Sequence, residues 1–138
     1  MKRLGLSLIL LMILIGLNGC SEKPIDTLQN SLNKYKECMI DNDFKCQVEL
    51  LDKVAMEKLI DMKIDDNTLI EQLKSSGVKM IDVKMDKPSK IIQNGKLLSS
   101  SINYSITANV QGKEMKMNAS IKAVSRDNGS TWFFSQGL

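Results

Sequence analysis

The sequence contains no histidine, and its 138 residues include only three Phe, two Tyr, one Trp and two Pro. The absence of histidine removes the commonest general base and the commonest metal ligand of proteins. Because aromatic residues are few, Met, Leu and Ile must fill much of the core, and the nine methionines suit that task through their flexible side chains. The formal charge of +3 is too small to indicate nucleic-acid binding.

The N-terminus has the pattern of an export signal. Met1-Lys2-Arg3 is basic, and an apolar run follows from Leu4 to Leu17. This run is too short for a comfortable membrane span, so we interpret residues 1–19 as a signal peptide. Residues 20–25 would then form a short tether, and residues 26–138 a single domain.

The end of this run carries a recognisable motif, because Leu17-Asn18-Gly19-Cys20 resembles the lipobox of bacterial lipoproteins. The resemblance implies cleavage before Cys20 and a lipid anchor on its thiol, so that the lipid bilayer is one partner. With Ser21 next, it also implies the outer membrane, facing the periplasm, in a Gram-negative cell, and the plasma membrane in a Gram-positive one. The alternative is an ordinary signal peptide that ends by coincidence at a cysteine.

Two cysteines remain if Cys20 carries lipid, and an oxidising compartment favours a bond between Cys38 and Cys46. Eight residues of one straight helix would separate them by about 12 Å, which is too far for a disulfide. We therefore expect a turn at Asp41-Asn42-Asp43. Two thiols without histidine make a poor zinc site, and we expect neither a metal nor a cofactor.

Helical patterns occupy the first half of the domain. We expect a helix over residues 26–39 and a second from Phe44 that buries Val48, Leu51 and Ala55 and continues helical through 54–62. Thr68 and Glu71 resemble a capping box that opens a third helix.

Strand patterns occupy the second half. Between Leu97 and Val124, apolar residues fall at every second position on either side of Gln111-Gly112, which predicts a long hairpin with one dry face. A phase change near Met80-Ile81 predicts a bulge in the strand over 78–85. A four-residue turn at 126–129 would then place Trp132 opposite Ala123 on the dry face.

These patterns predict an α+β fold with helices on one face of a curved antiparallel sheet. The Asn42-Asp43-Phe44 turn and the final run Asp127-Asn128-Gly129-Ser130-Thr131-Trp132-Phe133-Phe134 resemble the small NTF2-like (cystatin-like) lipoproteins. The resemblance implies a curved sheet wrapped on a long helix, sometimes with a cone-shaped pocket. It carries no catalytic residues over to this chain.

The function we expect is a non-catalytic binding or structural role in the cell envelope, with an envelope protein or a small apolar ligand as partner. One alternative is a ketosteroid-isomerase-like enzyme, which would need a buried acid near Tyr35 or Tyr104, and no acid falls on the dry strand face. The other is copper handling, because Met115 and Met117 place two thioethers on one face.

A ligand pocket, if the domain has one, should lie between the helices and the dry sheet face, near Tyr104, Met115, Met117 and Trp132. The alternative is that neighbouring alanines only let a helix pack closely. We also expect a monomer, because the outer sheet face would be polar and would offer little apolar area for an interface.

Overall fold

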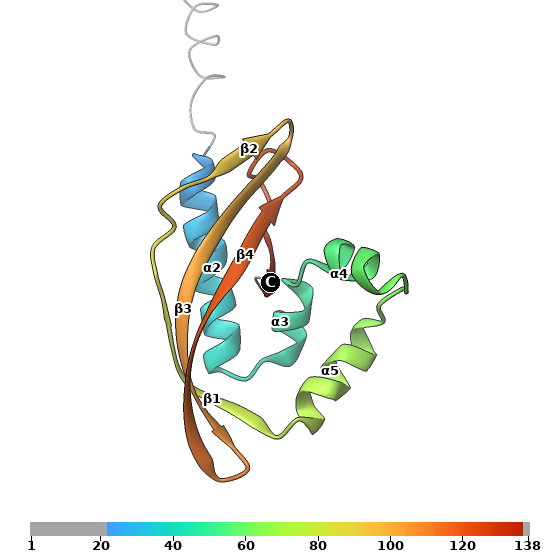
Figure 1. Cartoon of the computed structure of the whole chain (residues 1–138), viewed down its shortest axis with the longest axis vertical. Helices are drawn as coiled ribbons and strands as arrows, with labels where there is room; N and C mark the ends of the chain where they lie inside the picture. Colours follow the sequence, from blue (N-terminus) through green and yellow to red (C-terminus); the bar gives the residue numbers. More distant parts are fainter. Residues whose placement is uncertain (1–21, 137–138) are drawn as a thin grey trace, which may run out of the picture.

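A computed structural model describes residues 22–136; Cys20 and the predicted export signal lie outside the described residues. The elements in order are α2 (Pro24–Ile40), α3 (Phe44–Glu49), α4 (Lys53–Ile60), α5 (Asp66–Ser75), β1 (Val78–Met85), β2 (Ile92–Asn94), β3 (Leu97–Val110), β4 (Lys113–Ser125) and β5 (Phe133–Gln136). Helices therefore precede an antiparallel sheet and lie on one side of it, with α2 packed on its face, which confirms the predicted fold class (Figure 1). Within residues 22–136, no helix combines the length and the apolar character that crossing a membrane requires.

The long hairpin of β3 and β4 is the centre of the sheet, whose strand order is β1-β3-β4-β5 with β2 also paired to β3. Its register matches the prediction, with Ile106 opposite Met117 and Tyr104 opposite Ala119. The turn residues Gln111 and Gly112 both have positive φ, as a two-residue hairpin turn requires. The ladder between β1 and β3 shifts between Met80 and Asp82, so the predicted bulge is present.

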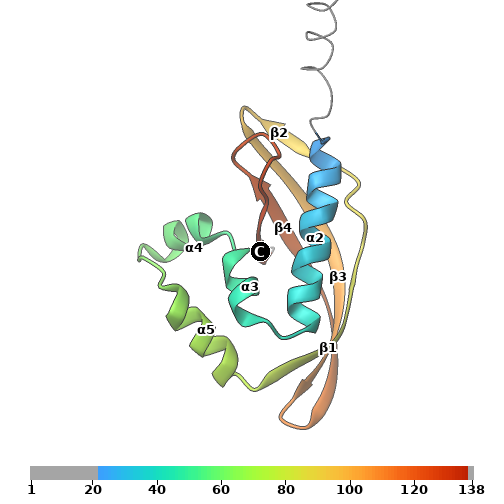
Figure 2. The same ribbon diagram turned by 180° about the vertical axis from the view of Figure 1, so that it is seen from behind.

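Helix α2 supplies the apolar layer that covers the inner face of the sheet. Figure 2 shows it lying along β3, and its residues Leu28, Leu32 and Met39 are buried in one cluster with strand residues such as Ile102. The helix begins two residues before the predicted start, because Pro24 is well tolerated in a first turn where its missing N–H costs nothing.

The predicted disulfide joins Cys38 and Cys46, whose Cα atoms lie 5.7 Å apart. The chain turns between them as expected, and Asn42 adopts a left-handed conformation there. The Asn42 side chain also accepts a hydrogen bond from the backbone N–H of Met80 at 2.9 Å. This turn therefore fastens the end of α2 to strand β1 as well as to α3.

The predicted continuous helix after Phe44 is interrupted at residues 50–52. There the backbone pairs with β5: the N–H of Phe134 donates to the carbonyl of Leu50 at 2.8 Å, and the N–H of Asp52 donates to the carbonyl of Phe134 at 2.7 Å. The interruption redirects the chain, and Ala55 is exposed instead of buried.

The loop before β5 also differs from the prediction, because Ala123 pairs with Phe134 and not with Trp132. Asp127 accepts hydrogen bonds from the backbone and hydroxyl of Thr131, which lengthens the turn. Trp132 leaves the ladder and donates its Nε1–H to the Thr27 hydroxyl at 3.0 Å. Glycine is required at position 129, since φ is +91° and a Cβ there would lie 2.7 Å from Cβ of Pro24.

The disulfide should contribute measurably to stability, because it closes a loop with a sequence separation of 8. Replacing both Cys38 and Cys46 by serine should lower the free energy of unfolding in urea by about 2–3 kcal/mol. Reduction of the unmodified chain should produce a similar loss, whereas it should leave the double variant unaffected. Thiol labelling of both cysteines in freshly isolated, unreduced protein would contradict this pairing.

Candidate functional site

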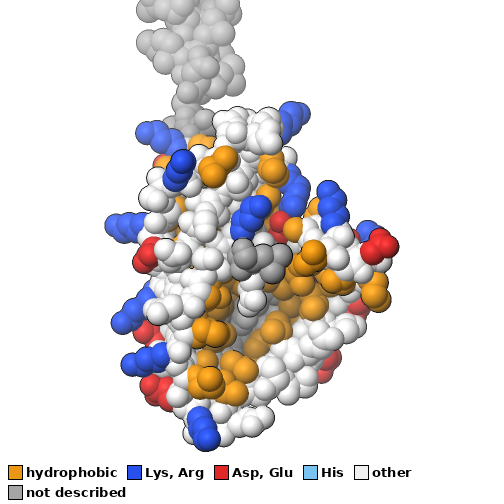
Figure 3. Space-filling model, viewed as in Figure 1, with side chains coloured by type: hydrophobic (Ala, Val, Ile, Leu, Met, Phe, Trp, Pro, Cys, Tyr) orange, Lys and Arg blue, Asp and Glu red, His pale blue; other side chains and the backbone are white. Residues whose placement is uncertain are grey.

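A large apolar groove lies between the sheet and the two helices α4 and α5. Its volume is about 1190 Å³, and Figure 3 shows hydrophobic side chains gathered in the hollow between these elements. Leu59 of α4 and Leu69 and Leu73 of α5 line one side, and Met80 and Ile106 of the sheet line the other. This volume is above the range of about 300–1000 Å³ typical of small-molecule sites.

The groove exists because α4 and α5 do not pack against the sheet. Both helices are amphipathic, yet neither contains a buried residue. Leu59, for example, is 73% exposed. A surface helix normally buries its apolar face against a neighbour. Here the apolar faces of α4 and α5 border an open space instead.

Strand β4 leaves the other side of the groove uncovered. Strand β5 pairs only with Ile121–Val124 of β4, so the preceding stretch, 113–120, has no second neighbour among the described strands. Met115 and Met117 lie in that stretch and are 56% and 55% exposed. The predicted dry face is therefore wrong over residues 113–118, all of which are exposed, because no helix covers this part of the sheet. Met115 and Met117 border the groove instead.

Three of the four residues expected near a pocket, Tyr104, Met115 and Met117, line the groove. Trp132 does not line it. Its side chain is fully buried beside Thr27, which lies in the first turns of α2. Tyr35 and Gln47 also line the groove, although sequence reasoning did not place them there. The period of the first helix put Tyr35 on the apolar face, but no signal showed that this part of the face borders a cavity.

Two tyrosines lie at the base of the groove, where α2 meets the sheet. The Tyr35 ring stacks on Phe134 with 4.9 Å between ring centroids, and Tyr104 is only 8% exposed. Burial raises the pKa of Tyr35 to about 12, with a smaller contribution from the nearby Tyr104 phenol, and burial also raises the pKa of Tyr104. Both hydroxyls are therefore neutral at physiological pH.

The groove contains almost no charge. Among the described residues that line it, none is Asp, Glu or Arg, and Lys122 is the only one with a charged side chain. Lys122 lies between the buried residues Ile121 and Ala123 in strand β4, so its side chain points to the outer face of the sheet. It therefore contributes only to the margin of the groove. The lining thus offers no carboxylate that could serve as a general base.

Methionine is the most distinctive component of the lining. Met39, Met56, Met80, Met115 and Met117 all contribute to it. Met80 of β1 and Met115 of β4 both pair with Ala108 of β3. Because the alanine side chain between them is small, space remains between the two methionine side chains. The described residues contain no group of three or more His, Cys, Asp or Glu side chains that could hold a metal. Flexible thioethers give an apolar surface that adapts to the shape of its ligand.

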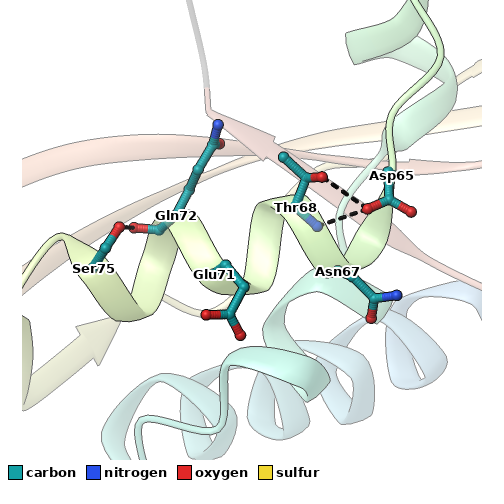
Figure 4. A pocket seen from close by; sticks show the side chains of 6 residues that line it. All are labelled: Asp65, Asn67, Thr68, Glu71, Gln72 and Ser75. Carbon is teal, nitrogen blue, oxygen red and sulfur yellow. Dashed lines mark hydrogen bonds between the residues drawn. The ribbon is translucent and has the colours of Figure 1, made fainter.

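A second, polar depression lies on α5 and is explained by helix capping. Figure 4 shows Asp65 accepting hydrogen bonds from the backbone N–H and the hydroxyl of Thr68, both at 2.8 Å. These bonds lower the pKa of Asp65. The predicted capping box is wrong in its position, since Asp65 caps the helix and Thr68 lies inside it.

No protein-family model matches the chain, and no curated protein is significantly similar to it.

The partly buried Tyr35 side chain should make the fold sensitive to alkaline pH. Its pKa is raised from 10 in the unfolded chain to about 12, so this contribution to stability is complete below pH 10 and is lost as the pH rises through 12. The free energy of unfolding should fall by about 2–3 kcal/mol over this interval. Urea titrations at pH 9 to 12, followed by Trp132 fluorescence, measure this loss, which should be largely absent in Tyr35→Phe. An equal loss in that variant would contradict the assignment.

Proposed function

We propose that this chain is a membrane-anchored, non-catalytic binding protein of a bacterial cell envelope, and that the apolar groove is its binding site. The observation that carries the proposal is the groove itself, which combines a volume of about 1190 Å³ with a lining of apolar side chains. Monomeric proteins seldom leave so much apolar surface uncovered unless it binds something.

The anchor would lie close to the groove. Residues 21–23 separate Cys20 from the first residue of α2 and can span at most about 10–14 Å. The rise along helix α2 from Pro24 to Tyr35 is about 17 Å. A lipid on Cys20 would therefore keep the groove within about 30 Å of the membrane, and in a Gram-negative cell Ser21 points to the outer membrane.

Two features favour binding over catalysis. The chain has no histidine, and the described residues of the groove lining include no carboxylate, so the isomerase-like alternative finds no base among them where its substrate would bind. A small apolar ligand fits this surface better than a strongly polar metabolite, because most of the lining is apolar and would leave many polar groups of the ligand without hydrogen-bond partners.

The anchor can be tested by metabolic labelling with an alkyne analogue of palmitate. The unmodified chain should incorporate the label in the membrane fraction, and Cys20→Ser should not. The double variant Cys38→Ser/Cys46→Ser is the control and should be labelled normally, since both residues are joined in the disulfide. Unlabelled protein with a free Cys20 thiol would refute the lipid anchor.

The groove can be tested with a charge placed in its lining. Residues 22–138 should bind a neutral apolar dye such as Nile red saturably and with 1:1 stoichiometry. Met117→Glu should weaken that binding at least about tenfold, because the ligand would desolvate the new carboxylate. Ile81→Glu is a matched control, since Ile81 is a strand residue that is 49% exposed and does not line the groove. Equal weakening by both substitutions would count against the groove.

A further inference from the structure

We infer that the ligand of the groove is an uncharged, elongated molecule with a hydrogen-bond-accepting oxygen, such as a long-chain acyl ester, and that Tyr35 and Tyr104 bind this oxygen. The inference rests on the proposed function and specifies its ligand class.

The first argument is that the two tyrosine hydroxyls differ from the other buried hydroxyls of the protein. Ser100 donates to the carbonyl of Lys90 at 2.7 Å, and Ser125 donates to Asp127 at 2.8 Å. No described residue forms a hydrogen bond with the hydroxyl of Tyr35 or Tyr104. Yet no fully buried polar side-chain atom of the described residues lacks a partner. Both residues line the groove, where a ligand could accept hydrogen bonds from their hydroxyls.

The second argument concerns charge. Burying a carboxylate in an apolar site is costly unless a cation pairs with it. The inner lining has no cation, since Lys122 belongs to the outer face. Two neutral phenols can each donate a hydrogen bond to an ester or ketone oxygen without any charge being buried. The groove should therefore select an uncharged acceptor over a carboxylate of the same chain length.

The third argument concerns shape. Along β3 the lining runs from Ser99 to Val110, and its part between Tyr104 and Val110 is about 20 Å long. Beyond Tyr104 the lining residues of β3 are all apolar and lead to Val110, which lies with Met115 toward the hairpin turn. Hydroxyl groups at one end of this part and an apolar path beyond them match a molecule with one oxygen-bearing end and a long hydrocarbon chain.

The fourth argument is the uncovered apolar surface of α4 and α5. These helices have no buried residue, although Leu69 and Leu73 face the groove. A hydrocarbon chain in the groove would give both helices the apolar contact that the sheet does not provide. The free energy gained from this contact grows with the apolar area buried, so it is largest for a ligand that extends along the whole groove.

The experiment uses the full chain reconstituted in lipid nanodiscs. Hexadecanoic acid and its methyl ester, each with a diazirine near the middle of the chain, are cross-linked to it, and the labelled peptides are identified by mass spectrometry. We expect the ester to label groove peptides saturably and the acid to label them at least about tenfold less. Tyr35→Phe and Tyr104→Phe should each raise the ester concentration needed for half-maximal labelling by about 2- to 10-fold, the effect of one ordinary hydrogen bond.

The tyrosine variants keep the ring, so groove shape and packing are unchanged, and the fluorescence of Trp132, which is buried and does not line the groove, verifies the fold. Because each comparison uses the same probe and the same nanodiscs, partition into lipid cancels between the unmodified chain and its variants. Two results would overturn the ligand class and leave the proposed groove function intact: equal labelling by the acid and the ester, or a half-maximal ester concentration that neither substitution changes. Absence of groove labelling by either probe would overturn both.

Discussion

The helical side of the groove depends on one junction with the sheet, where residues 50–52 pair with Phe134 through two backbone hydrogen bonds. Asp52 completes this junction. It is 1% exposed, its carboxylate lies 2.9 Å from the Arg126 guanidinium, and it also accepts a hydrogen bond from the N–H of Ala55 at the start of α4. A buried carboxylate without its partner costs about 3–5 kcal/mol, so this pair largely fixes where α3 ends and α4 begins.

That junction explains why the groove is open. By ending α3 at β5, it turns α4 and α5 away from the sheet, and the chain returns to the sheet only at β1. Strand β5, which contains Phe134 of this junction, pairs only with Ile121–Val124 of β4. The uncovered part of β4 and the unpacked faces of α4 and α5 are thus two results of one arrangement. The groove follows from the backbone path and does not need a missing or shrunken side chain.

Sequence patterns correctly predicted those elements whose contacts are made between residues close together in the chain. Period-two alternation gave the register of the β3–β4 hairpin, and the cysteine spacing gave the turn at Asn42. The interruption at residues 50–52 could not be predicted, because its partner, Phe134, lies more than eighty residues later in the chain. Trp132 was misplaced for a related reason, since its hydrogen bond to Thr27 of α2 outweighs its place in the strand. The groove was predicted in part, from the face that carries Met115 and Met117, whereas Tyr35 joins it only through the packing of α2.

Helix α2 connects the proposed anchor to the groove. Its first turns are fixed to the sheet side by the bonds of Thr27 to Trp132 and to the carbonyl of Gly129. Its last turns supply Tyr35 and Met39 to the groove, and Cys38 ties the same end to α3. Both ends of α2 are therefore fixed within the domain. Among the described helices, α4 and α5 bury no residue, so they have the least packing to lose if they adjust to what the groove binds.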